Sequence, residues 1–254
     1  GALAGTTGSG FLGALIAGLL GGYIVNFLKK ASKCLPESLE GIKPMLIYPF
    51  FGILIMGFIS LFILAPPVSA INGWMVDTLK NMDPSARIFM GMIVAGMMAV
   101  DMGGPINKAA YVTGTGLLAS GEFHVMAAVM AGGMVPPLAI ALCTTFFKNR
   151  FTESERKAGI TNYVMGLSFI TEGAIPFAAA APLRVIPACV VGSAVTGALT
   201  MAFDCTLRAP HGGIFVVPTI GNPLMYLVSI LVGAVVGCVI LSILKKPLKN
   251  GEDK

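Results

Sequence analysis

The amino-acid sequence predicts an all-α polytopic membrane protein with about six transmembrane helices. Of its 254 residues, 56% are hydrophobic and 11% are charged, whereas a soluble domain carries about 25% charged residues. Several apolar stretches are long enough to cross a bilayer, and lysines or arginines follow several of them. The 32 glycines and 16 prolines are typical of closely packed and interrupted membrane helices.

The stretches that we expect to cross the membrane are residues 11–27, 45–64, 88–100, 124–147, 183–203 and 226–244. Pro66 and Pro67 should end or kink the second of them. Thr152, followed three residues later by Glu155, has the spacing of a helix capping box. Because four of the six residues at positions 152–157 are charged, we expect a short amphipathic helix on the membrane surface there.

Positive residues indicate the orientation of the chain. The basic clusters at residues 29–33, 148–150 and 245–249 should all be cytoplasmic. This arrangement works if the break at residues 103–105 turns the chain back on the cytoplasmic side and a re-entrant hairpin surrounds Glu172. We therefore expect one membrane-embedded domain over residues 1–254, with a scaffold-like part at 1–100 and a substrate-binding part at 101–250.

Composition and spacing also exclude several functions. The net charge of +5 lies at the ends of apolar segments, and no basic run is interleaved with aromatic residues, which argues against nucleic-acid binding. The five cysteines are scattered without metal-ligand spacing, so we expect reduced thiols, no metal and no cofactor. Nothing resembles a nucleophile–base triad or a phosphate-binding loop.

The most informative segment is residues 166–177, Gly-Leu-Ser-Phe-Ile-Thr-Glu-Gly-Ala-Ile-Pro-Phe. It places the carboxylate of Glu172 in an apolar run, at a cost of about 2.5–3.5 kcal/mol if it lies at the centre of a membrane helix. Such a charge normally faces a cavity or a polar partner. Gly173 and Pro176 interrupt the helix and free backbone polar groups. The segment predicts a polar substrate site; the alternative is a surface loop with a solvated glutamate.

Further candidate site residues lie near other breaks. Thr171 adds a hydroxyl beside Glu172, and Gly173 gives the broken backbone. Asn107 suits sugar hydroxyls or a helix cap, and Lys108 suits pairing with Glu172, binding a phosphate or reaching the interface as a helix-end lysine. His211, in Ala-Pro-His-Gly-Gly, is either a substrate ligand or a surface histidine.

Other polar residues have weaker patterns. His124 begins a predicted span beside Glu122, and we expect it at the membrane interface. Arg184 and Arg208 suit phosphate binding or a topology signal, and Asp101 and Asp204 are left without an assigned role.

Three motifs resemble the fructose family of enzyme IIC domains of the bacterial phosphotransferase system. They are residues 166–177 with Pro-Leu-Arg-Val-Ile-Pro at 182–187, Gly-Gly-Pro-Ile-Asn-Lys-Ala-Ala-Tyr at 103–111, and Ala-Pro-His-Gly-Gly-Ile-Phe-Val at 209–216. Family members are usually longer by about two amino-terminal spans, and they commonly carry Asp where Ala181 stands.

The resemblance implies a homodimeric sugar permease of the bacterial inner membrane. It would translocate fructose or a fructose-like sugar, which a phosphorylated enzyme IIB partner then phosphorylates, with Glu172 contacting the sugar. The chain shows no phosphorylating cysteine or histidine motif of its own, so it should not act alone as a transferase. Two alternatives remain: a proton-coupled sugar symporter in which Glu172 titrates, and a sugar sensor without net flux.

Overall fold

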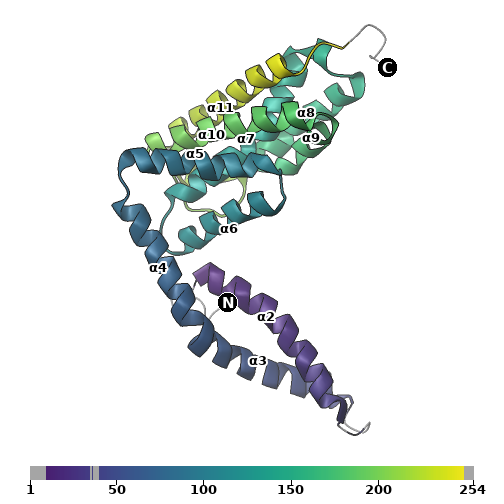
Figure 1. Ribbon diagram of the computed structural model, residues 1–254, viewed down its shortest axis with the longest axis vertical. Helices are drawn as coiled ribbons and strands as arrows, with labels where there is room; N and C mark the ends of the chain where they lie inside the picture. Colours follow the sequence, from purple (N-terminus) through teal and green to yellow (C-terminus); the bar gives the residue numbers. More distant parts are fainter. Residues whose placement is uncertain (1–9, 35, 37–39, 249–254) are drawn as a thin grey trace. The chain divides into compact units, whose positions relative to one another are not determined.

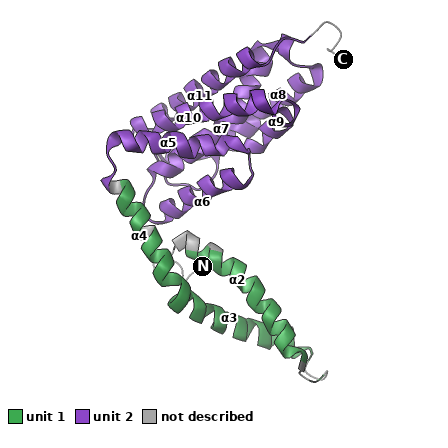
Figure 2. Ribbon diagram, viewed as in Figure 1, with its two compact units in different colours: residues 1–80 green, residues 81–254 purple. Residues whose placement is uncertain are grey.

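The computed structural model describes residues 10–34, 36 and 40–248 of the chain. It consists of helices with one two-stranded ribbon, and it divides into two compact units, Gly1–Lys80 and Asn81–Lys254 (Figure 2). Each unit is described by itself. The assignment of residues 1–100 to a scaffold stays a prediction.

The first unit is built from two helical arms (Figure 1). The first arm is α2 (Gly10–Ala31), continued by a 3₁₀ turn, η1 (Ser32–Cys34). The second is a continuous helical run of four pieces: η3 (Lys43–Ile47), α3 (Tyr48–Phe58), η4 (Ile59–Leu64) and α4 (Ala65–Asn81).

This second arm is longer than the stretch predicted at residues 45–64. Pro66 and Pro67 do not end it, because the helical run continues through them from η4 into α4. The six-residue π-helical segment η4 immediately precedes them. A local π segment is one way in which a helix accommodates a proline in a membrane protein.

The second unit contains the rest of the helices. In chain order they are α5 (Pro84–Val100), α6 (Pro105–Ala119), α7 (His124–Phe146), η5 (Lys148–Arg150), α8 (Glu153–Leu167), η6 (Thr171–Ala174), α9 (Ile175–Ala180), α10 (Pro182–Ala202), η7 (Gly213–Thr219) and α11 (Pro223–Leu244). Strands β1 (Thr206–Leu207) and β2 (Ile220–Gly221) pair antiparallel.

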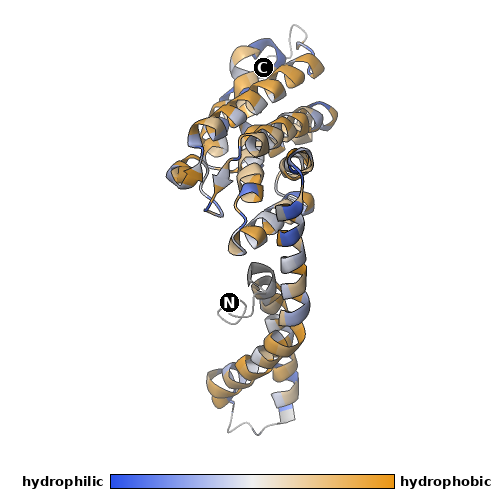
Figure 3. Cartoon of the chain, turned by 90° about the vertical axis from the view of Figure 1, so that its left-hand side faces the viewer, coloured by the Kyte–Doolittle hydropathy of each residue, from blue (hydrophilic) through white to orange (hydrophobic). Residues whose placement is uncertain are grey.

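The helices confirm an all-α polytopic membrane protein. Within the described residues, four helical stretches are long and apolar enough to cross a membrane: Lys43–Leu79, His124–Phe146, Pro182–Ala202 and Pro223–Leu244. Hydrophobic residues predominate along these helices (Figure 3). The apolar helix α5 is shorter, with 17 residues, and the chain turns back after it.

Helix α7 forms the centre of the second unit. It is buried along almost its whole length and packs against α5, α8, α10 and α11. Small residues allow these helices to approach closely. A Cβ atom added to Gly132 of α7 would lie 2.6 Å from the Cβ atom of Ala95 in α5. Between the neighbouring helices α10 and α5, a Cβ atom on Gly197 would lie 2.1 Å from the carbonyl oxygen of Gly91.

Polar contacts define the two ends of this unit. At one end, His124 at the start of α7 lies 3.0 Å from Asp204, which follows α10. At the other, Arg150 after α7 donates a hydrogen bond to the carbonyl oxygen of Lys245 after α11. We call these the His124 end and the Lys245 end. The predicted cytoplasmic clusters at 148–150 and 245–249 therefore meet at one end as far as residue 248, and Lys249 lies outside the described residues.

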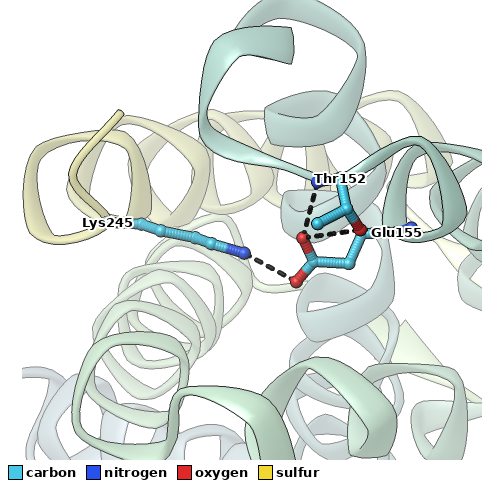
Figure 4. Close-up of polar contacts among 3 residues, drawn as sticks. All are labelled: Thr152, Glu155 and Lys245. Carbon is cyan, nitrogen blue, oxygen red and sulfur yellow. Dashed lines mark hydrogen bonds and ion pairs between the residues drawn. The ribbon is translucent and has the colours of Figure 1, made fainter. Parts of the chain in front are cut away.

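The Glu172 segment lies in a hairpin that enters from the Lys245 end. Helix α8 begins with the predicted capping box of Thr152 and Glu155 (Figure 4). It runs back along α7, so that Gly159 faces Thr144 and Gly166 faces Leu138. Helix α9 then returns. The helix predicted as a short surface element is therefore 15 residues long, because its glycines allow it to pack on α7.

A second hairpin enters from the His124 end. Helix α5 packs against α10, and α6 turns back along α5. Gly114 of α6 faces Met126 and Val129 in the first turns of α7. The break at residues 101–104 is its tip, and Met98 just before the tip lies beside Gly133 in the middle of α7. The chain turns back at the predicted break, but the predicted place of the turn is wrong: it lies beside the middle of α7 and not at the Lys245 end, where the basic clusters meet.

A third broken segment also starts at the His124 end. Strand β1 is held there because the N–H group of Leu207 donates to the carbonyl oxygen of Phe123, at 3.0 Å. The loop between β1 and β2 then reaches the tip of the first hairpin, where a Cβ atom on Gly213 would lie 2.1 Å from the carbonyl oxygen of Leu167. Gly213 has φ of +58°, so glycine suits this close approach.

Candidate functional site

The three broken segments meet around a cavity of about 240 Å³. Five of the six predicted site residues line it: Asn107, Lys108, Thr171, Glu172 and His211. Three residues that sequence reasoning did not select complete the lining: Met98, Tyr111 and Phe169. The volume lies below the range of about 300–1,000 Å³ that is usual for drug-sized ligands. It therefore suits a small molecule.

Glu172 and Lys108 connect the tips of the two hairpins. The Nζ atom of Lys108 lies 3.6 Å from Oε1 of Glu172, and the side chains are 59% and 48% exposed. An ion pair this long and open contributes little to stability. Both charged groups are therefore available to a ligand, the carboxylate as an acceptor and the ammonium as a donor.

The second hairpin tip is held by its own carboxylate, Asp101. Its Oδ2 accepts from the N–H of Ile106 at 2.7 Å, and its Oδ1 accepts from that of Asn107 at 2.9 Å. These are orphan donors in the first turn of α6, and a negative charge is favoured there. Asp101, which the sequence left without a role, is thus a structural cap.

Asn107 has a divided role. It is 3% exposed, and its Nδ2 donates to the carbonyl oxygen of Met98 at 2.7 Å. This bond satisfies a carbonyl at the interrupted end of α5 and fastens α6 to it. The capping role considered from sequence belongs to Asp101 instead, and the Asn107 amide reaches the cavity from a fixed position.

Aromatic rings form one wall of the cavity. The ring of Phe169 lies 4.9 Å from that of His211, and Tyr111 lies 6.3 Å from Phe169 and 6.5 Å from His211 between ring centroids. Phe169 has a φ of +62°, an uncommon conformation that often marks a functional constraint. Such rings offer an apolar surface in a cavity that polar side chains also line.

Two of the predicted site residues, Thr171 and Gly173, make structural contacts within the protein. Thr171 is 3% exposed and donates its hydroxyl to the carbonyl oxygen of Gly133, at 3.0 Å. Gly173 is absent from the lining. It packs against α8, where a Cβ atom would lie 2.4 Å from Oδ1 of Asn162. Gly173 therefore brings the two arms of the hairpin together.

The remaining polar candidates lie outside the cavity lining. His124 sits between Glu122 and Asp204, at 3.7 and 3.0 Å, and the guanidinium of Arg208 lies 5.2 Å from the ring centroid of Phe123. Both contacts are at the His124 end. Arg184 is exposed on α10.

The residues missed by sequence reasoning carry recognisable signals. Tyr111 follows Asn107 and Lys108 by four and three positions, a spacing that puts all three on one helical face. Phe169 belongs to the same segment as Glu172.

Cys143, Cys189, Cys205 and Cys238 are free and buried, as predicted, whereas the side chain of Cys34 is outside the described part.

Comparison with known proteins identifies the family. A family model described as "Phosphotransferase system, EIIC" matches residues 2–192. The chain belongs to this family. It is 54% identical over 240 residues to the PTS system fructose-specific EIIABC component of Bacillus subtilis (strain 168), covering 94% of this chain and 38% of that protein. It is 53% identical over 242 residues to the fructose permease IIC component of Bacillus amyloliquefaciens, covering 95% and 79%.

A third relative is the PTS system fructose-specific EIIB'BC component of Rhodobacter capsulatus, with 52% identity over 229 residues, 89% of this chain and 39% of that protein. The EIIC chain thus spans about two fifths of the length of two of these three relatives. No solved structure matches it. These names describe phosphotransferase components and give no support to a proton-coupled symporter.

Ala181, at the position where the resemblance implied a common Asp, occupies the N-cap position of α10 and makes no side-chain capping bond. It is not among the cavity residues. An aspartate there would accept a bond from a free N–H group of the first turn, so the alanine removes a helix cap.

Proposed function

We propose that this EIIC domain translocates fructose, or a fructose-like sugar, across the inner membrane for phosphorylation by a partner enzyme IIB. The observation that carries the proposal is the convergence of Asn107, Lys108, Glu172 and His211 on one small cavity between broken helices. In a membrane, interrupted backbone is tolerated where protein or a polar cavity surrounds it. The fructose-specific names of the relatives support the choice of sugar.

The cavity offers complementary chemistry to a sugar. A carboxylate accepts hydrogen bonds from two neighbouring hydroxyls, and an ammonium donates to others. A sugar that enters between Glu172 and Lys108 would replace their 3.6 Å contact with shorter bonds to both groups. Its C–H face would pack on the rings of Phe169 and Tyr111. Binding would thus connect the two hairpin tips through the ligand.

The partner and assembly follow from the same proposal. The name of the Rhodobacter capsulatus relative places EIIB and EIIC components together, and this supports an enzyme IIB partner as the phosphate donor. The first unit exposes large apolar side chains such as Tyr23, Phe27 and Trp74. A surface of this kind fits contact with lipid and with a second copy in a homodimer.

Phosphoenolpyruvate-dependent uptake of labelled fructose tests the proposal. The protein is expressed with its phosphotransferase partners, as wild type and as Glu172→Gln, and phosphorylated fructose is measured inside the vesicles. We expect accumulation in the wild type and none in the variant. Glu153→Gln is the matched control, because Glu153 is an exposed carboxylate that pairs with Lys157 outside the cavity lining.

Two results would contradict the proposal. Wild-type uptake by Glu172→Gln would remove Glu172 from the site. Accumulation of free fructose under a proton gradient, without phosphoenolpyruvate or partner proteins, would indicate a symporter instead.

A further inference from the structure

Two adjacent carbonyl groups of α7 lack their helical partners. Pro136 and Pro137 lie inside this helix. Because proline has no N–H group, the carbonyls four residues earlier, on Gly132 and Gly133, lack their regular α-helical hydrogen bonds. A buried carbonyl without a partner is costly in a membrane protein. The Pro-Pro pair therefore creates two neighbouring acceptors in the middle of α7.

Each acceptor receives a hydroxyl from a different element. Ser193 of α10 donates to the carbonyl oxygen of Gly132 at 2.8 Å, and Thr171 of η6 donates to that of Gly133 at 3.0 Å. Both hydroxyl side chains are buried. The first bond joins two long helices of the bundle. The second fastens the tip of the Glu172 hairpin.

Gly133 has a second contact with this tip. A Cβ atom there would lie 2.4 Å from the Phe169 ring. The same residue thus provides the acceptor for Thr171 and the space for Phe169, two residues that line the cavity on either side of Ile170. The geometry fixes the backbone of the tip between these two anchors, immediately before Glu172.

We infer that Thr171 is a positioning residue that acts through Glu172, and that Pro137 makes this possible by freeing the Gly133 carbonyl. The inference rests on the proposed sugar transport and refines the role of Thr171. Its hydroxyl proton is committed to α7, so it holds the neighbouring carboxylate at the cavity. Preorganising a binding group in this way improves affinity because less order is lost when the ligand binds.

A matched set of variants tests the inference in the uptake assay. Thr171→Val removes the hydroxyl at nearly constant shape, and Thr171→Ser keeps it. We expect Thr171→Val to raise the half-saturating fructose concentration about fivefold, the size expected for one lost neutral hydrogen bond. Thr171→Ser should stay within about twofold of wild type. Ser193→Ala is the control, because it removes the companion bond to α10.

Pro137→Ala separates positioning from general stability. Alanine restores an N–H group that pairs with the Gly133 carbonyl and turns it back toward the helix axis. We expect a more stable helix together with a raised half-saturating concentration, and no further increase when Pro137→Ala is combined with Thr171→Val. If the bond from Thr171 to the Gly133 carbonyl only stabilises the fold, the half-saturating fructose concentration of Pro137→Ala should equal that of wild type.

The outcomes distinguish this inference from the proposed function. If wild-type protein shows no phosphoenolpyruvate-dependent uptake, the proposed function fails. If wild type transports and Glu172→Gln does not, while Thr171→Val or Pro137→Ala saturates like wild type, the inference alone is wrong. An equal increase in Ser193→Ala would also overturn it, because that bond does not reach the hairpin. The amount of each variant in the membrane is measured to normalise uptake.

Discussion

Two glutamate–lysine pairs in the second unit are made from the same residue types but differ in the distance between the charged groups, in their exposure and in their further contacts. Glu155 and Lys245 lie 2.7 Å apart with side chains 22% and 11% exposed, whereas Glu172 and Lys108 lie 3.6 Å apart and are 48% and 59% exposed. The second oxygen of Glu155 accepts from the N–H group of Thr152 at 2.9 Å, and the ammonium of Lys245 lies 4.1 Å from the Phe151 ring centroid.

The difference teaches how surroundings decide the role of a charge pair. At the Lys245 end, the two charged groups contact each other closely, have further neighbours, and join the start of α8 to the end of α11 (Figure 4). At the hairpin tips, the charged groups of Lys108 and Glu172 are more exposed and line a cavity. The first pair should therefore govern stability, and the second should govern ligand binding. The following predictions test this division, starting with the largest expected effect.

Gly103→Ala should lower fructose uptake by about a hundredfold. Gly103 has a φ of +122°, and a Cβ atom there would lie 2.9 Å from Oε1 of Glu172, so the substitution strains the tip and displaces the carboxylate. Gly121→Ala is the control, because Gly121 has a φ of +87° and nothing within 4 Å. Equal losses in the two variants would attribute the effect to backbone strain and contradict the contact with Glu172.

Glu155→Gln should lower the free energy of unfolding by about 2 kcal/mol, because it leaves the largely buried ammonium of Lys245 without its counter-charge. Glutamine keeps the capping bond to Thr152, so the change isolates the ion pair. Thermal unfolding in detergent measures the loss. The half-saturating fructose concentration should not change; a large increase would mean that this pair also shapes the cavity.

Lys108→Gln should raise the half-saturating fructose concentration about tenfold through the loss of a charged donor to the sugar. Its effect on stability should stay below about 0.5 kcal/mol, because the pair with Glu172 is long and exposed. Uptake kinetics and thermal unfolding are measured on the same preparation. A stability loss as large as that of Glu155→Gln would show that the two pairs are equivalent.

Lys157→Gln should have the smallest effect, below about 0.5 kcal/mol in stability and without change in uptake. Lys157 lies 2.6 Å from Glu153, but the side chains are 75% and 62% exposed. A short distance alone therefore does not make a strong pair. A loss above 1 kcal/mol, by the rule for exposed pairs, would contradict exposure as the deciding quantity.

Much of the fold was predictable because its signals are local. Apolar runs predicted the long helices, the spacing of Thr152 and Glu155 predicted a helix start, and Gly-Pro breaks marked the tips. Pro66 and Pro67 were predicted to end or kink the second span; they do not end it, because the helix continues through them after the π-helical segment η4. The length of α8 was missed because its contacts with α7 are made by glycines far from Thr152 in the chain.

In the candidate site, too, the features that the sequence predicted are local, and those that it did not predict depend on contacts between distant segments. The sequence by itself determined which residues are polar at the breaks, since a charge such as Glu172 in an apolar run is unusual wherever it lies. The tertiary structure alone decided their roles: the pairing of Glu172 with Lys108, the cap made by Asp101, and the donation from Thr171 to the Gly133 carbonyl. An interrupted helix leaves its polar groups to be satisfied by segments distant in sequence, and which segment arrives depends on the packing of the whole unit.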